Sequence, residues 1–246
     1  YEFITLDNSY KKVKSIISYL KKASIDNKCK IIDKELIPEK ELVELDNFIE
    51  DYNQKIKMNE ILGVNLNNIT DSFFNKGVFQ DIDDQQEKLE KYKSYFDQFA
   101  LSLGAIIDNS GKTRADVKRS DKEDYFLTIT KSKSKILSSL IKKNPDKMIS
   151  FNSGKFNYKL SDLELKNTAT QCKIFSGDIK QNSHLRVTYE NRVKNMCIKQ
   201  FTELAYDYYT KHTLLLDAIC NFVSRVDYLS SVARVSLYNG YVKPTI

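Results

Sequence analysis

The sequence is poor both in residues that break regular structure and in residues typical of catalytic or metal sites. Its 246 residues include 7 glycines, 3 prolines, 4 cysteines and 2 histidines. Scarce glycine and proline disfavour a turn-rich β-sandwich and favour long helices. No uncharged apolar run approaches the roughly 18 residues that a membrane span requires. The charged start and short apolar stretch of a signal peptide are absent too.

The cysteines are widely spaced, and none of them forms a CxxC pair. Their spacing predicts neither a zinc site nor a dithiol redox site. Few cysteines and no secretion signal predict a reducing, intracellular setting. We expect all four to be small apolar residues or unremarkable thiols. They are Cys29, Cys172, Cys197 and Cys220.

What the chain does contain is charge, distributed unevenly. At 41% apolar and 29% charged residues it is too apolar for a disordered chain. Residues 1–100 carry 15 basic and 19 acidic side chains, residues 101–170 carry 14 and 8, and residues 171–246 carry 10 and 6. The middle segment alone therefore has a surplus equal to the whole chain's net charge of +6. Such a cluster favours binding to a phosphate backbone, although a lysine-rich surface that only maintains solubility is the alternative.

Apolar residues at steps of three and four predict three helices before the basic segment. The first covers Ser9–Lys22, with a polar loop at Ser24–Lys30. The second opens at Pro38 and carries an apolar stripe as far as Ile56. A break is expected at Gly63–Asn68.

The third predicted helix runs over Ile82–Leu103 and ends at Gly104. Three carboxylates at its start, Asp81, Asp83 and Asp84, fit helix capping. They do not fit an EF-hand, because the further oxygen ligands and the terminal glutamate are missing.

The basic segment has a different pattern, typical of a small β-rich unit. Asn109–Asp124 is polar and basic, with a turn residue at Gly111. The alternating sequence YFLTIT, residues 125–130, predicts a strand. Met148–Phe151 and Phe156–Leu160 predict a hairpin about a turn at residues 152–154.

After Gly177 a helical pattern persists for nearly 60 residues, until Gly240 and Pro244 stop it. At 1.5 Å per residue such a helix is roughly 80–90 Å long. It needs a partner helix, and the Ile82–Leu103 helix is the natural antiparallel one. The expected fold is therefore mainly α, with two extended antiparallel arms and a small β-rich unit inserted at their tip.

The remaining motifs are weak. Ser110-Gly111-Lys112-Thr113 is similar to the end of a phosphate-binding loop, but six residues rather than four separate the glycines and a strand follows, so a basic turn is the better interpretation. His184 and His212 have no other ligand at zinc spacing and are expected on a helix surface or in a satisfied, partly buried site. Stacking of single strands on the basic stretch Lys131–Lys147 is a further alternative. We predict that the nearby rings belong to the core instead.

The carboxyl-terminal sequence LLLDAICNFVSRVDYLSSVARVSLYNGYVKPTI resembles the MutS family of DNA mismatch-repair proteins. The Phe74–Leu89 region and YFLTIT resemble that family's rising lever helix and the clamp strand that follows it. The resemblance covers residues 70–246 well, and residues 1–70 match only as generic lever helices. At the carboxyl end it is carried by Asp227, Leu229, Ser230, Ser231, Ala233, Tyr241, Val242, Lys243 and Pro244.

The resemblance implies a lever–clamp fragment that grips the duplex backbone without reading sequence. We assign lever helices with the rising arm to residues 1–104, the clamp to 105–178, and the descending arm to 179–246. Residues 131–160 depart from the bacterial pattern, in that a hairpin replaces the usual helical continuation, as in eukaryotic or viral forms. We predict phosphate contacts for Lys112, Arg114, Lys118, Arg119, Lys131, Lys133, Lys135 and Lys155.

We expect no catalytic site, cofactor or metal in this chain, whose first residue, Tyr1, suggests a piece of a longer protein. The resemblance implies that the parent is an ATPase using ATP and Mg²⁺, is a dimer, and binds double-stranded DNA, with no membrane. The alternative function is a helical scaffold or protein-interaction module that does not bind nucleic acid.

Overall fold

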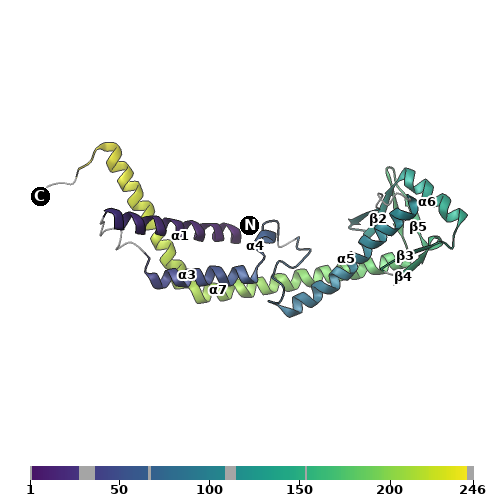
Figure 1. Cartoon of the computed structure of the whole chain (residues 1–246), viewed down its shortest axis with the longest axis horizontal. Coiled ribbons are helices and arrows are strands. Elements are labelled where there is room, and N and C mark those ends of the chain that lie inside the picture. Colours follow the sequence, from purple (N-terminus) through teal and green to yellow (C-terminus); the bar gives the residue numbers. More distant parts are fainter. Residues whose placement is uncertain (1, 28–36, 66–67, 109–114, 153, 243–246) are drawn as a thin grey trace. The chain divides into compact units, whose positions relative to one another are not determined.

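The structure, a computed structural model, describes residues 2–27, 37–65, 68–108, 115–152 and 154–242. It is mainly helical with two small antiparallel sheets (Figure 1). The chain forms two compact units: unit 1 comprises Tyr1–Asn68, Phe73–Val78 and Cys197–Ile246, and unit 2 comprises Ile69–Ser72 and Phe79–Met196. The helices are α1 (Glu2–Asn27), α3 (Glu39–Lys55), α4 (Met58–Ile61), α5 (Gln80–Ile107), α6 (Lys131–Lys143) and α7 (Gly177–Asn239). The strands are β1 (Asp116–Ser120), β2 (Asp124–Thr130), β3 (Met148–Phe151), β4 (Phe156–Lys159), β5 (Glu164–Asn167) and β6 (Gln171–Phe175).

In unit 1 the first predicted helix is confirmed and is longer than expected. α1 continues through Asn27, so the loop predicted from Ser24 is wrong in its described part. Ser24 is 4% exposed, and its burial shows how tertiary packing overrides a polar local sequence. The rest of that predicted loop, residues 28–30, lies outside the described residues.

Helix α3 opens after Pro38, as predicted, and has Glu39 and Glu41 in its first turn. Its buried side chains include Phe48, whose ring lies 5.2 Å from that of Tyr208 on α7. The helix ends at Lys55 rather than at Ile56, because Ile56 forms an isolated bridge with Phe74. The break after α4 is confirmed in its described residues.

Helix α5 of unit 2 corrects two predictions. Gly104 does not end it, since Leu103 and Ile107 are both buried and core packing outweighs the cost of a helical glycine. The three aspartates do not cap it either, because the N-cap position is Phe79 and no side chain makes the capping hydrogen bond. Asp81 and Asp83 lie in the first turn, where their charge favours the positive end of the helix dipole.

The strands of unit 2 form a four-stranded antiparallel sheet in the order β1-β2-β6-β5 and a separate β3-β4 hairpin. The predicted strand at residues 125–130 is confirmed as β2, and the hairpin is confirmed as β3 and β4. Strands β1, β5 and β6 were not predicted. They are short and lysine-containing, with interrupted apolar alternation, so only their pairing with β2 and with one another defines them.

The core of unit 2 lies between this sheet, the hairpin and α5. Leu127 on β2 and Ile174 on β6 are paired in register and fully buried. Phe99 on α5 stacks on Phe151 and Tyr158 of the hairpin, with ring centroids 5.2 and 5.3 Å apart. Aromatic packing therefore fixes the hairpin to α5.

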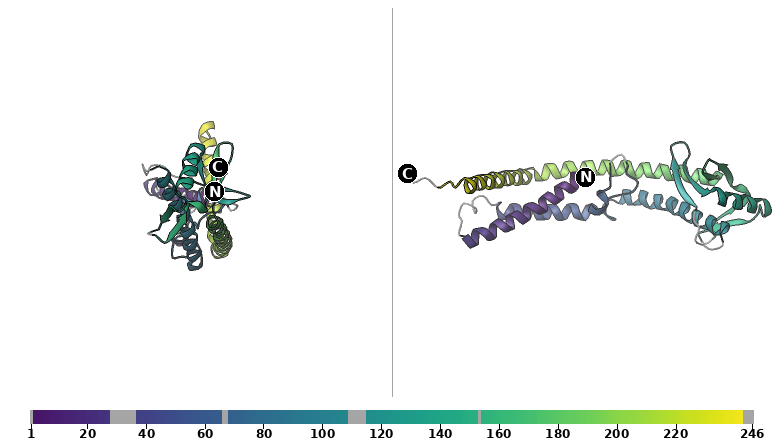
Figure 2. Two further views of the ribbon diagram at one scale, coloured as in Figure 1. Left: turned by 90° about the vertical axis from the view of Figure 1, so that its right-hand side faces the viewer. Right: turned by 90° about the horizontal axis from the view of Figure 1, so that it is seen from above.

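The long helix predicted after Gly177 is confirmed as α7, which has 63 residues. Its first turns lie antiparallel to α5 in unit 2 (Figure 2). There the Tyr92 and Tyr189 rings stack at 5.5 Å, and the Arg186 guanidinium lies 5.7 Å from the Phe96 ring. The helical partner predicted for this stretch is therefore correct. None of the described helices has both the length and the hydropathy to cross a bilayer.

Candidate nucleic-acid interface

Helix α6 was not predicted from the sequence. The expectation that a hairpin replaces the helical continuation of the strand is wrong, because Lys131–Lys143 is helical and the hairpin comes after it. The helix carries five lysines and no acidic residue. It follows β2 without a linker: Thr130 ends the strand and its side chain accepts a hydrogen bond from the backbone N–H of Lys133 as the N-cap. Leu137 is fully buried in the unit 2 core and anchors the helix. Asn144 follows the last turn and precedes Pro145, which disfavours continuation.

One face of α6 is lined with lysine and serine. A pocket of about 490 Å³ lies between this face and the end of β5. Its lysines, Lys131, Lys135 and Lys142, recur at helical spacing and so lie along one side of the helix. The pocket is completed by Ser134, Ser138, Ser139, Asn167 and Thr168.

Among the residues that the structure describes, the lysines of α6 have no counterions. The helix contains no acidic residue, and its first turn, where carboxylates are usually favourable, carries lysine instead. Among the described residues none of its ammonium groups has an ion-pair partner. Such an uncompensated row of cations attracts anions. Of the pocket serines, Ser134 donates a hydrogen bond to Asn167 and Ser139 donates one to the Ile136 carbonyl, so Ser138 is the serine that can donate to a phosphate oxygen.

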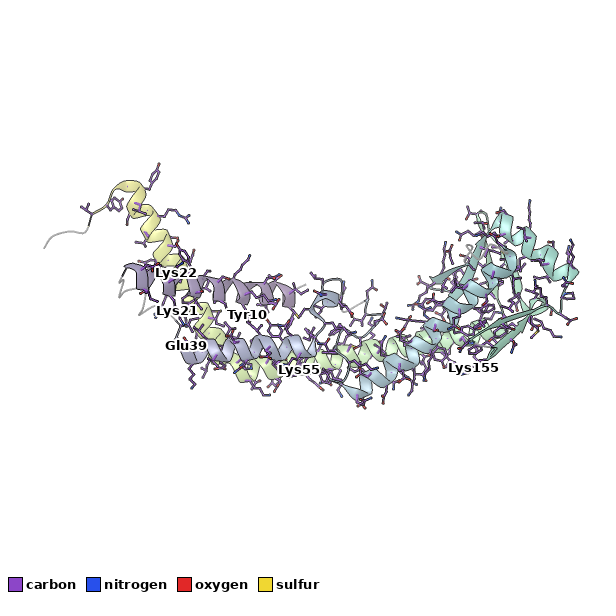
Figure 3. All side chains as sticks on the ribbon, viewed as in Figure 1. Tyr10, Lys21, Lys22, Glu39, Lys55 and Lys155 are labelled. Carbon is purple, nitrogen blue, oxygen red and sulfur yellow. The ribbon has the colours of Figure 1, made fainter. Side chains whose placement is uncertain are left out.

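The structure brings some of the predicted contact residues together and separates others. Lys131 and Lys135 line the α6 pocket, while Lys133 lies between them in sequence but does not line it. Lys118, on β1, donates a hydrogen bond of 2.9 Å to Gln171. Lys155, labelled in Figure 3, is in the hairpin turn with its ammonium 6.0 Å from the Phe156 ring. Lys112 and Arg114 lie outside the described residues.

Arg119, also on β1, is held by an internal network. It forms a 3.2 Å ion pair with the buried Glu190 of α7. The Tyr125 hydroxyl donates a 2.8 Å hydrogen bond to the same carboxylate. Burial raises the pKa of Tyr125 above its ordinary value, and the hydrogen bond to Glu190 raises it further. Among the predicted contact residues that the structure describes, Arg119 is therefore the one that is solvent-exposed and also paired with a buried carboxylate.

Sequence reasoning missed Lys142, the pocket serines, Asn167 and Thr168 as site residues. A helical periodicity search over residues 131–142 would have found the lysine row, since 131, 135, 138 and 142 recur at steps of four, three and four. The β5 residues had no local signal, because only the β5–β6 pairing brings that strand beside α6.

Where the structure describes them, the other motifs supply no competing site. His212 is partly buried and lies 3.1 Å from Glu44, as a satisfied histidine should, and His184 is exposed on α7. Cys172 and Cys197 are buried thiols, whereas Cys220 is exposed. Cys29 and the loop-like Ser110–Thr113 motif lie outside the described residues. Within the described ranges, no group of three or more His, Cys, Asp or Glu side chains is arranged to hold a metal ion.

Comparison with known proteins gives one informative relative. No family model matches the chain. A mutS homolog of Acanthamoeba polyphaga mimivirus, named as a DNA mismatch repair protein, is 29% identical over 255 residues. The similarity supports a MutS-like relationship. It covers 100% of this chain but only 22% of the relative, so the chain corresponds to about a fifth of a MutS homolog.

Proposed function

We propose that this chain is the DNA-binding lever and clamp portion of a MutS-like mismatch-repair ATPase. In this proposal unit 2 grips the backbone of duplex DNA, and the helices transmit that state to an ATPase, with its ATP and Mg²⁺, elsewhere in a larger, dimeric intracellular protein. The mismatch-repair assignment is supported by similarity over the whole chain. The proposal that unit 2 grips DNA rests on the lysine row of α6 (Lys131, Lys135 and Lys142), which has no counterion among the described residues.

The dimensions of the row suit a phosphate backbone. Lys131 and Lys142 are eleven residues apart on α6, which corresponds to about 16 Å along the helix axis. One DNA strand presents a phosphate roughly every 3.4 Å along the duplex axis. Because the strand winds around that axis, a straight row of this length faces only a few successive phosphates, which suits three lysines. Lysine ammoniums contact phosphate oxygens without distinguishing bases. We therefore expect binding that is independent of sequence and strongly dependent on salt.

The test is a titration of the full chain with duplex DNA at two or more salt concentrations. Replacing Lys131, Lys135 and Lys142 by glutamine should lower the slope of log affinity against log salt by about three, and the affinity at 0.1 M salt on the order of a hundredfold. The control variant, Lys12→Gln, Lys22→Gln and Lys40→Gln, changes the net charge equally on exposed lysines of unit 1 and should retain most of the affinity. Equal losses from both variants, or no salt-dependent binding by the wild type, would refute the proposal and favour a scaffold function.

A further inference from the structure

Glu190 joins the sheet of unit 2 to α7. This carboxylate is 5% exposed and receives bonds from three side chains. Arg119 of β1 contacts one of its oxygens at 3.2 Å, and Tyr125 of β2 and Arg186 of α7 contact the other at 2.8 and 3.2 Å. A buried carboxylate is tolerated only with such compensation. The bonds from Arg119 and Tyr125 link β1 and β2 to the helix, and Arg186 supports the carboxylate from within α7.

The two arginines of this network are not equivalent. The Arg186 side chain is 14% exposed, and its guanidinium lies 3.7 Å from the Tyr125 ring centroid. The Arg119 side chain is 48% exposed, and its guanidinium lies 5.4 Å from the same ring. Arg186 is therefore fixed by packing as well as charge, whereas Arg119 already reaches solvent.

This difference allows one partner to leave without stranding the carboxylate. If Arg119 moves away, Glu190 keeps the Arg186 ion pair and the Tyr125 hydrogen bond. Because solvent reaches the Arg119 guanidinium, its pair with Glu190 is screened more than the Arg186 pair. A guanidinium also binds phosphate through two parallel N–H donors. A phosphate at the surface of β1 can therefore compete with Glu190 for Arg119.

We propose that Arg119 exchanges between Glu190 and a phosphate of bound DNA, and that Glu190 is the positioning residue through which this exchange reaches α7. The inference rests on the proposed function, since it takes the duplex backbone as the source of the phosphate. It adds to that function a specific contact: a phosphate bound at Arg119 of β1 changes the hydrogen-bond partners of Glu190 on α7.

Glu190→Gln tests the exchange through affinity. The amide keeps an acceptor for Tyr125 but no longer holds Arg119 by charge. We expect duplex affinity to rise about two- to fivefold, the worth of a weak ion pair. Arg119→Ala should abolish that gain and lower the salt slope by about one. The control, Glu164→Gln, removes the same charge from the exposed 3.0 Å pair with Lys180 and measures the gain due to net charge alone. A gain no larger than the control's, or one that persists without Arg119, would overturn the exchange.

A second measurement uses the unmodified protein and does not depend on duplex binding. Inorganic phosphate is titrated while the arginine side-chain signals are followed by NMR, with Arg119→Lys identifying the Arg119 signal. The Arg119 signal should shift, and that of Arg186 should follow it, because both guanidiniums share the Glu190 carboxylate. The control is Arg192, whose guanidinium lies 5.1 Å from the Tyr189 ring and whose signal should not shift in step with them. If Arg119 does not shift, or if Arg192 shifts as much, the exchange is wrong, whatever the duplex result. If Arg119 responds to phosphate but the wild type does not bind duplex DNA, the proposed function fails instead.

Discussion

Helices α1 and α6 contain the same number of lysines but use them differently. In α1, Lys11 pairs with Asp7 at 2.6 Å, Lys14 pairs with Asp46, and Lys21 pairs with Glu39 of α3 at 2.6 Å (Figure 3). In α6 no described lysine has such a partner. Lysines paired in this way are neutralised within the protein, whereas unpaired ones remain available to an external anion. The five lysines of α1 are Lys11, Lys12, Lys14, Lys21 and Lys22, and those of α6 are Lys131, Lys133, Lys135, Lys142 and Lys143.

The difference between the paired lysines of α1 and the unpaired lysines of α6 can be removed by giving α6 a counterion. Ser138→Glu places a carboxylate four residues before Lys142 and three after Lys135, where it can pair with both. If the unpaired state matters, duplex affinity at 0.1 M salt should fall on the order of tenfold, and the salt slope should fall by one to two. Fluorescence anisotropy with a labelled duplex measures both quantities.

The matched control for this variant is Ser9→Glu, which adds the same charge to an exposed position of α1. It should leave the affinity close to that of the wild type. A similar loss from both variants would mean that net charge, and not the α6 row, governs binding.

The paired side of the contrast can be weakened at Asp7. This buried carboxylate accepts a 2.7 Å hydrogen bond from Tyr52 as well as pairing with Lys11. Tyr52→Phe leaves the carboxylate with one partner fewer and should lower the free energy of unfolding by about 1–2 kcal/mol. Chemical denaturation at pH 7 measures the loss, and Tyr19→Phe on the exposed side of α1 should show none.

The same pair predicts an alkaline effect. Burial raises the pKa of Tyr52, and the hydrogen bond to Asp7 raises it further. Because the folded pKa lies above the unfolded value of about 10, the stabilisation is complete below pH 10 and is lost as the pH rises above it. Between pH 9 and 11 the wild type should therefore lose more stability than Tyr52→Phe. Parallel pH profiles would contradict the assignment.

The smallest expected effect is on the free energy of unfolding, which should change in opposite directions in two lysine variants. Lys11→Gln should cost about 0.5 kcal/mol of stability, because Asp7 loses its ion pair. Lys131→Gln should instead gain about 0.3 kcal/mol, because a cation is removed from the positive end of α6. Thermal denaturation of the two single variants compares them directly. Destabilisation of equal size in both would show that α6 has a counterion after all.

The sequence predicted the elements whose pattern is local. Val13 and Ile17 of α1, the apolar face of α3 and the long periodicity of α7 needed no tertiary information. It failed where distant residues decide: Gly104 stays helical because Leu103 and Ile107 are buried, and β5 exists through its pairing with β6. α6 was missed because lysine and serine obscure the few apolar residues that anchor it.

The site was predicted as a region more accurately than as a set of residues. The basic surplus of residues 101–170 located the segment, and Lys131 and Lys135 do share one pocket. Charge counting could not show that Arg119 is bonded to Glu190, 71 positions away, or that Lys118 contacts Gln171. Such partners are properties of the folded sheet, and no spacing in the sequence encodes them.

The direct junction between β2 and α6 has a mechanical consequence. Thr130 is the last residue of the strand and the cap of the helix, and it is paired with Gln171 in the β2–β6 ladder. No linker residue separates the two elements, so a force on Lys131 cannot be taken up by a flexible connection. A force on α6 would act directly on the hydrogen bonds of β2, one of the two inner strands of the sheet. The helix and the sheet are therefore mechanically coupled.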